Sequence, residues 1–418
     1  MSWNPAALGP LAGTHVYAQG AASLGSGVFE RSALDRFPER TDDEPETFAP
    51  AEYQALSTDW FFGLAHDFAS DRVVAAGGAF TPFVERSAQR DWPGTYHRRE
   101  VDWYHLYAPS FALAFRVSGD FYIGVGLSFV RSWLHTSFDR DLVLEDADLR
   151  PLGYESPGGR QRLAVQTAGW GFTGAVGVYY RPRRSLDIGV GWFFRQAVRT
   201  AGSAQVIDYD GSFSGRATAE YQMPDVVNAG VEWRPRERIA ASLSLRYVSS
   251  SQHDDLVLRP SGYEFSRRPR RPDEAIIPES IVIDRGFDDL WGLDGAVSYS
   301  PASGFAAGIG SMVETSAVDE NRVSPAQIDG PKVAGRVFAV LRPAQWFSIG
   351  VTWELSMMRD REVGDSVYDP DAALRCVDSG YDVDECEELS EGRALPDPGG
   401  RYELVAQRFL LGATLDRW

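Results

Sequence analysis

The sequence predicts an all-β fold, a fourteen-stranded antiparallel β-barrel that crosses a membrane. Three observations predict it: apolar and small or polar residues alternate along many segments, short turns alternate with long connections, and aromatic residues gather near the ends of the expected strands. Glycine is abundant, with 41 residues in 418, and aromatic residues make up 12%. No stretch of eighteen apolar residues occurs, so the chain has no candidate transmembrane helix, whereas a barrel strand needs only about 10 alternating residues.

The alternation has a period of two residues. In DFYIGVGLSFV, Ile123, Val125 and Leu127 face one way, whereas Gly124 and Gly126 face the other. Successive side chains of a strand point to opposite faces, so such a segment has one apolar face and one small or polar face. The same pattern occurs in GWGFTGAVGVYY, SLDIGVGWFF, ERIAASLSLRY and WFSIGVTWELS.

The connections between these segments fall into two classes. The short ones are turns rich in Pro, Gly and Arg: RVSGD, RPRRS, RPRER, SPASG and RPAQ. The long ones are polar and are expected at 24–57, 83–102, 139–167, 201–221, 251–287, 317–330 and 359–400. Short turns at one end and long loops at the other are typical of bacterial outer-membrane barrels. A soluble sandwich or propeller would bury the same aromatic residues in a core, but it gives no reason for the segregation of loop lengths.

The expected strands number fourteen, an even count, as a barrel with both chain ends on the periplasmic side requires. They are expected at 11–23, 59–68, 72–82, 103–116, 120–137, 168–181, 185–200, 222–234, 237–250, 288–300, 304–316, 332–342, 345–358 and 402–418.

Charge and motifs exclude several functions. The formal net charge of −18 argues against a nucleic-acid partner, which would need a basic face. The sequence contains no G-x-S-x-G, H-E-x-x-H or G-x-G-x-x-G motif, so we expect no enzyme activity, no metal and no cofactor.

Four strings in register then resemble one family. They are NPAALGPLAG (4–13), LYAPSFALAFRVSGDFYIGVGLSF (106–129), GWGFTGAVGVYYRP (169–182) and MPDVVNAGVEWRP (223–235). Together with the strand count, they resemble the FadL/TodX-type (OMPP1) long-chain fatty-acid and hydrocarbon transporters of Gram-negative outer membranes.

The resemblance implies a domain organisation. In this family a signal peptide and a small plug precede the barrel, and an Asn-Pro-Ala turn lies near the end of the plug. Asn4, Pro5 and Ala6 match that turn, so we expect residues 1–10 to be the remnant of the plug and 11–418 to form the barrel. The signal peptide and most of the plug are then missing from the chain as written.

The resemblance also implies a lateral opening at a kink in strand three. In RVVAAGGAFTPF (72–83), Gly77, Gly78 and Pro82 are candidate weak points, because proline lacks a ladder donor and glycine packs no side chain. The alternative is that Gly77 and Gly78 only let bulky neighbours pack.

Two further groups of residues are candidates for binding or cross-linking. Arg195, Arg246 and Arg336 fall on the expected inner face and could contact a carboxylate, since a guanidinium binds it bidentately. Alternatively, they form a salt-bridged lumen network that holds the plug. Cys376 and Cys386 are close in one acidic segment, which favours a disulfide in an exported chain and reduced thiols in a cytosolic one.

These observations predict a monomeric barrel in the Gram-negative outer membrane. We expect it to admit long-chain fatty acids or other hydrophobic small molecules passively and to contact outer-membrane lipid and lipopolysaccharide. The alternative is a structural or adhesive barrel that binds a surface partner through its long loops.

Overall fold

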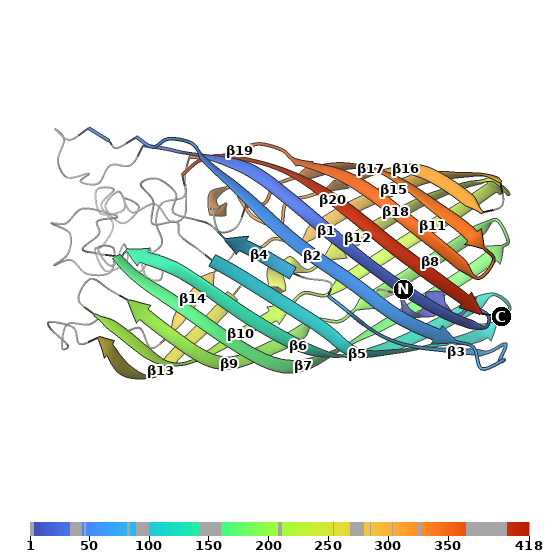
Figure 1. Cartoon of the computed structure of the whole chain (residues 1–418), viewed down its shortest axis with the longest axis horizontal. Coiled ribbons are helices and arrows are strands. Elements are labelled where there is room, and N and C mark those ends of the chain that lie inside the picture. Colours follow the sequence, from blue (N-terminus) through green and yellow to red (C-terminus); the bar gives the residue numbers. More distant parts are fainter. Residues whose placement is uncertain are drawn as a thin grey trace, which may run out of the picture.

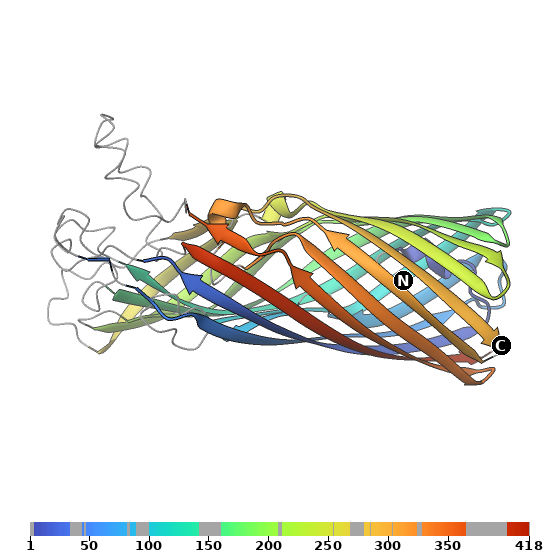
Figure 2. The ribbon, with the colours of Figure 1, turned by 90° about the horizontal axis from the view of Figure 1, so that it is seen from above.

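The computed structural model describes thirteen segments of the chain. These are residues 4–33, 44–45, 47–81, 84–88, 100–141, 160–207, 211–253, 255–267, 280–284, 286–302, 304–323, 328–364 and 399–417. They form an elongated closed barrel of antiparallel strands (Figure 1). The view turned by 90° shows the same cylinder (Figure 2).

The strands follow one another around the wall in chain order. They are β1 (Thr14–Arg31), β2 (Ala51–His66), β3 (Val73–Phe80), β4 (Val84–Ala88), β5 (Glu100–Ser118), β6 (Phe121–Asp141), β7 (Arg160–Arg183), β8 (Leu186–Phe193), β9 (Gln196–Ile207), β10 (Ser212–Met223), β11 (Val226–Arg236), β12 (Ile239–Val248), β13 (Asp255–Arg267), β14 (Ile281–Asp284), β15 (Leu290–Ala302), β16 (Phe305–Glu314), β17 (Lys332–Ala344), β18 (Phe347–Met358), β19 (Arg361–Val363) and β20 (Gly400–Arg417). Short 3-10 helices lie at Pro5–Leu8 (η1), Ser250–His253 (η4) and Glu320–Arg322 (η6).

Fourteen spans make up the wall, which confirms the predicted count. Six spans are each divided in two by a break: β3/β4, β8/β9, β10/β11, β12/β13, β14/β15 and β18/β19. The barrel closes because β1 pairs with both β2 and β20, and the β1–β20 register runs without interruption from Thr14↔Arg417 to Arg31↔Gly400. Closure pairs the first span with the last, so neither is an edge strand.

Tight turns connect the strands at one end. Gly119 between β5 and β6, and Gly304 between β15 and β16, have φ values of +51° and +94°. Glycine adopts this left-handed conformation without the steric cost that a Cβ would bring, so these turns can be short. None of the helices among the described residues is long and apolar enough to cross a membrane.

The outer face next to these turns is apolar. Along β6 the outward side chains are Ile123, Val125, Leu127 and Phe129, which are 41–48% exposed. The inward positions there are mainly glycine, serine and tyrosine, as the alternation predicted. A lipid-facing wall needs this arrangement, because hydrocarbon solvates the outer side chains and the lumen holds water or ligand.

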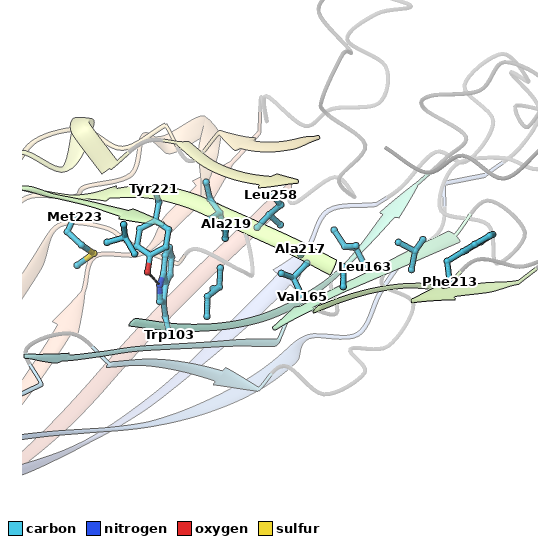
Figure 3. Close-up of a cluster of buried hydrophobic side chains, with 14 residues drawn as sticks. Trp103, Leu163, Val165, Phe213, Ala217, Ala219, Tyr221, Met223 and Leu258 are labelled. Carbon is cyan, nitrogen blue, oxygen red and sulfur yellow. Dashed lines mark hydrogen bonds between the residues drawn. The ribbon is translucent and has the colours of Figure 1, made fainter. Parts of the chain in front are cut away.

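At the other end of the barrel, apolar side chains point into the interior and polar ones point outward. Fourteen buried apolar side chains fill its interior, including Leu163, Phe213 and Leu258, which are 0–1% exposed (Figure 3). The outward positions of β9 and β10 there are mostly small or polar. We call this buried set the distal core; its members are Trp103, Leu134, Leu163, Val165, Val198, Ala204, Val206, Phe213, Ala217, Ala219, Tyr221, Met223, Leu256 and Leu258.

The long connections predicted from sequence are too long. The strands β1, β7, β9 and β10 extend well into segments that we expected to be polar loops. Their outward residues are polar because this part of the barrel projects beyond the apolar band, and a strand with a polar outer face resembles a loop in sequence.

Candidate functional site

The N-terminal segment folds back inside the barrel. Its helix η1 begins after Asn4, whose side-chain Oδ1 accepts a hydrogen bond from the Ala6 amide at 3.0 Å. Pro5 occupies the first helical position, where its missing N–H costs nothing. The Asn-Pro-Ala sequence therefore encodes the start of this helix directly.

Two glycines of the barrel wall, Gly124 and Gly177, leave the space that η1 occupies. Asn4 donates from Nδ2 to the Val178 carbonyl of β7 at 3.1 Å. A Cβ added to Gly177 would overlap the Asn4 amide, and one added to Gly124 would overlap the backbone at Ala6. The small lumen face of β6 and β7 thus allows the segment to approach the wall at backbone distance.

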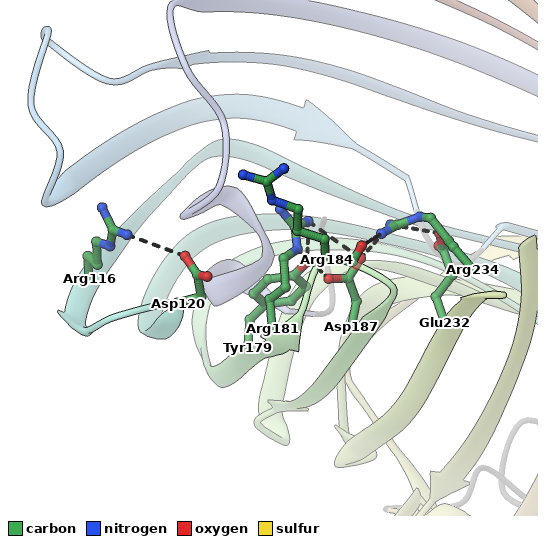
Figure 4. Close-up of polar contacts among 8 residues, drawn as sticks. All are labelled: Arg116, Asp120, Tyr179, Arg181, Arg184, Asp187, Glu232 and Arg234. Carbon is green, nitrogen blue, oxygen red and sulfur yellow. Dashed lines mark hydrogen bonds and ion pairs between the residues drawn. The ribbon is translucent and has the colours of Figure 1, made fainter. Parts of the chain in front are cut away.

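An ion-pair network supports this wall near the short turns. Arg181 donates to Asp187 at 2.5 Å and to the Tyr179 hydroxyl at 2.8 Å, and Arg234 makes a second ion pair with Asp187 (Figure 4). Glu232 pairs with Arg234 at 2.8 Å. Asp187 is only 7% exposed, so its two arginine partners offset the cost of burying its charge.

A lower cavity of about 390 Å³ lies beside η1. Its lining is mostly apolar and includes Pro5 and Leu8 of η1 and Phe80 of β3. It also touches Leu64 and Phe111, which are 46% and 54% exposed on the outer face. The cavity therefore reaches the wall itself, where Gly77 stands between Leu64 and Phe111 and adds no side chain.

The third span is interrupted above this cavity. Gly77 and Gly78 are paired with both β2 and β5, and the register between β3 and β5 shifts directly after Gly78. Thr81 makes two further hydrogen bonds to β2: its amide donates to the Trp60 carbonyl, and its side-chain Oγ1 accepts from the Trp60 amide, both at 3.0 Å. Beyond it, β4 pairs with β5, and no β2–β4 pairing occurs among the described residues. Pro82 lies outside the described residues.

An upper cavity of about 470 Å³ lies deeper in the lumen, between the lower cavity and the distal core. Its lining combines apolar residues, among them Trp103 and Phe287, with polar and charged ones. Among the charged residues, Arg408 pairs with Asp59 at 2.7 Å. A cavity that offers both apolar and charged groups can hold an amphipathic molecule.

An aromatic partition separates the two cavities. Phe80 and Tyr107 stack with ring centroids 4.9 Å apart, and Phe193 lies 5.7 Å from Tyr107. Tyr107 is fully buried, and its hydroxyl has no hydrogen-bond partner among the described residues. Phe80 and Phe193 also line the lower cavity, and Val248, Leu290 and Ala317 of the same buried cluster line the upper one, so this cluster lies between the two cavities.

The three candidate arginines have different environments. Arg336 is engaged by Asp294, with Nη2 2.6 Å from Oδ1. Arg195 lies in the break between β8 and β9, is exposed, and donates to the Gln252 side chain at 3.2 Å; it lines neither cavity. Arg246 lines the upper cavity and has no ion pair among the described residues.

Sequence reasoning missed the aromatic partition and the distal core. A signal was present in DWYHLYAPS, where Trp103, His105 and Tyr107 alternate and all point inward. Cys376 and Cys386 lie outside the described residues. In the part of the chain that the structure describes, no cluster of His, Cys, Asp or Glu could hold a metal ion.

The closed barrel and its inner segment can now be compared with known proteins. The model of the outer membrane protein transport protein family (OMPP1/FadL/TodX) matches residues 1–358. The chain belongs to this family. Its members are outer-membrane transport channels for hydrophobic compounds rather than enzymes, so the short turns face the periplasm and the distal core lies on the extracellular side.

Solved structures agree on the fold. A Pseudomonas aeruginosa FadL homologue superposes with a TM-score of 0.74 at 15% identity, covering 99% of this chain and 92% of that one. The toluene transporters TodX of Pseudomonas putida and TbuX of Ralstonia pickettii give TM-scores of 0.64 and 0.63, both at 12% identity with the same coverage. A comparison with curated protein sequences gave no significant match.

Proposed function

We propose that this member of the OMPP1/FadL/TodX family is a passive channel for long-chain fatty acids. The observation that carries the proposal is Arg246, a guanidinium that lines the upper cavity together with Trp103 and Phe287 and has no ion pair among the described residues. A carboxylate would satisfy Arg246 while the acyl chain lies against Trp103 and Phe287. A neutral hydrocarbon, such as the toluene named for TodX and TbuX, would gain nothing from Arg246.

The proposed route runs inward along apolar surfaces. The ligand enters past the distal core, rests in the upper cavity, passes the partition of Phe80 and Tyr107, and reaches the lower cavity. It leaves through the wall at the interruption of the third span, next to Thr81. Movement is driven by the concentration gradient, and no cofactor takes part.

Uptake of two radiolabelled substrates tests the choice of ligand. The full chain, supplied with a secretion signal, is expressed in a host lacking its own transporter, and uptake of oleate and toluene is measured. Arg246→Gln should lower oleate uptake about tenfold, since a charge-assisted hydrogen bond contributes roughly 1.5–3 kcal/mol. Toluene uptake should not change, and Arg342→Gln, in a short periplasmic turn, should alter neither.

Transport of toluene but not oleate by the folded barrel would contradict the fatty-acid proposal. Equal oleate uptake by Arg246→Gln and the unchanged chain would remove Arg246 from the site. A heat-modifiable band on gels confirms that each variant has folded.

The segment Asn4, Pro5 and Ala6 is proposed as the end of the plug that gates this route. Gly177→Val would push a side chain into the Asn4 amide and dislodge η1. We expect a higher single-channel conductance in planar bilayers, because η1 no longer obstructs the lumen. Gly335→Val is the matched control, since a Cβ there meets nothing within 4 Å. Unchanged conductance of Gly177→Val would contradict a gating role for the segment.

A further inference from the structure

The outer face of β6 and β7 changes character in regular steps along the barrel. Opposite pairs run from Val125 and Val176, through Phe129 and Phe172, to Arg131 and Trp170. Beyond that row the outward residues are Trp133, then His135 and Gln166. Aliphatic, aromatic and then polar residues are the order expected when a wall passes from hydrocarbon into a membrane interface.

The pair of Arg131 and Trp170 lies at the height expected for the outer boundary of the membrane. Phe121 and Tyr180 form an aromatic pair at the periplasmic end of the same two strands. The strand from Phe121 to Arg131, at about 3.3 Å per residue and a tilt of about 40°, rises about 25 Å. That is the thickness of the apolar band of such barrels, so Arg131 lies where lipid headgroups begin.

Arg131 is held between two indole rings. Its guanidinium carbon lies 5.3 Å from the ring centroid of Trp133 and 5.1 Å from that of Trp170. No carboxylate among the described residues pairs with it. The two rings fix the guanidinium by cation–π attraction but leave its charge uncompensated on a lipid-facing surface.

A second arginine approaches from the next span. Ala168 of β7 pairs with Ala201 of β9, which brings Arg199 alongside Trp170. The Arg199 side chain is 77% exposed and shares Glu220 with Arg259, at 3.1 and 2.7 Å. Arg199 and Arg259 thus share the one carboxylate of Glu220. With Arg131, the described outer face around Trp170 therefore carries more positive than negative charge.

We propose that Arg131 and Arg199, on either side of Trp170, bind the phosphate groups of lipopolysaccharide in the outer leaflet. The two strand backbones are separated by about 10 Å, twice the spacing between neighbouring strands. Guanidinium groups bind phosphate bidentately, and Trp170 and Phe172, which are 66% and 71% exposed, present apolar surface to the acyl chains.

The test uses the full-length barrel, purified and delipidated in detergent. Native mass spectrometry measures binding of lipid A, of lipid A with its phosphates removed, and of phosphatidylglycerol. The unchanged barrel should bind lipid A at least tenfold more tightly than either other lipid. The double variant Arg131→Gln/Arg199→Gln should lose this preference, whereas Arg238→Gln/Arg342→Gln, in the periplasmic turns, should keep it.

Equal binding of intact and dephosphorylated lipid A by the unchanged barrel would overturn the proposal without any variant. So would equal binding of phosphatidylglycerol, which would indicate a general anion site, or retention of the preference by the folded double variant.

Discussion

The β8/β9 span passes through both halves of the barrel, β8 through the periplasmic half and β9 through the extracellular half. In β8, Ile188, Val190 and Trp192 are outward and 39–45% exposed, while Asp187 and Gly189 face the lumen. In β9 the apolar residues are inside instead: Val198 and Val206 are 0–4% exposed, and Arg199 points outward.

The medium on each side of the wall, rather than strand geometry, therefore decides which face of a strand is apolar. The strands keep the same pleat and pairing across the boundary. At the boundary, Phe194 and Arg195 add one residue relative to β7, because Ala175 pairs with Phe193 and Ala168 with Ala201. This bulge shifts the inward positions from odd to even numbers.

Removing the extra residue should have the largest effect. Deleting Arg195 would turn Val198, Ala204 and Val206 outward and bury Arg199, since a one-residue slip exchanges the two faces of a strand. We expect the extracellular half to lose its packing, at a cost of more than about 5 kcal/mol. Limited proteolysis of the purified barrel measures this. Arg195→Ala, which keeps the length, should remain resistant; equal resistance of the deletion would contradict the role of the bulge.

An arginine placed on the outer face should lower the free energy of unfolding far more in the periplasmic half than in the extracellular half. Val176→Arg places a charge in the apolar band and should lower the free energy of unfolding by roughly 2–4 kcal/mol. Ser203→Arg places the same charge on the outer face of the extracellular half and should change it by no more than about 0.5 kcal/mol. Denaturant titration of both variants in lipid bilayers checks this, and similar losses would mean that the apolar band extends farther than the structure indicates.

The smallest effect is expected at the periplasmic edge, where Asp67 lies in water. Its carboxylate accepts hydrogen bonds from the backbone amides of Gly13 and Ala69, and these bonds hold its pKa below the ordinary value of 3.8. The stability that this carboxylate contributes is therefore present above pH 4 and is lost as the pH falls through the lowered pKa. Asp67→Asn should melt slightly earlier than the unchanged chain at pH 7. The gap should close as the pH falls below the lowered pKa; a gap that widens in acid would contradict this assignment.

Alternation and turn chemistry were enough to predict the fourteen spans, whereas the place of Asn4 in the plug turn came from the family resemblance. They could not show that Arg336 is neutralised and Arg246 is not. The partner of Arg336 is Asp294, which lies two spans away around the wall, and such pairing depends on register rather than on local sequence. A weak point in the third span was expected at Gly77, Gly78 or Pro82, because glycine packs no side chain and proline lacks a ladder donor. The structure keeps both glycines paired, shifts the β3–β5 register after Gly78 and ends β3 at Phe80, so the assignment of a lateral opening to these residues stays a prediction.

On the proposed route, a hydrophobic ligand passes through the lower cavity beside β3. Ala76 faces this cavity, whereas Ala75 on the same strand faces outward. In a background with Cys376→Ser and Cys386→Ser, Ala76→Cys and Ala75→Cys are each labelled with a bulky thiol reagent, and oleate uptake is measured before and after reduction. Labelling at position 76 should block uptake and reduction should restore it, while labelling at position 75 should leave uptake unchanged. Undiminished uptake after complete labelling at position 76 would contradict the route.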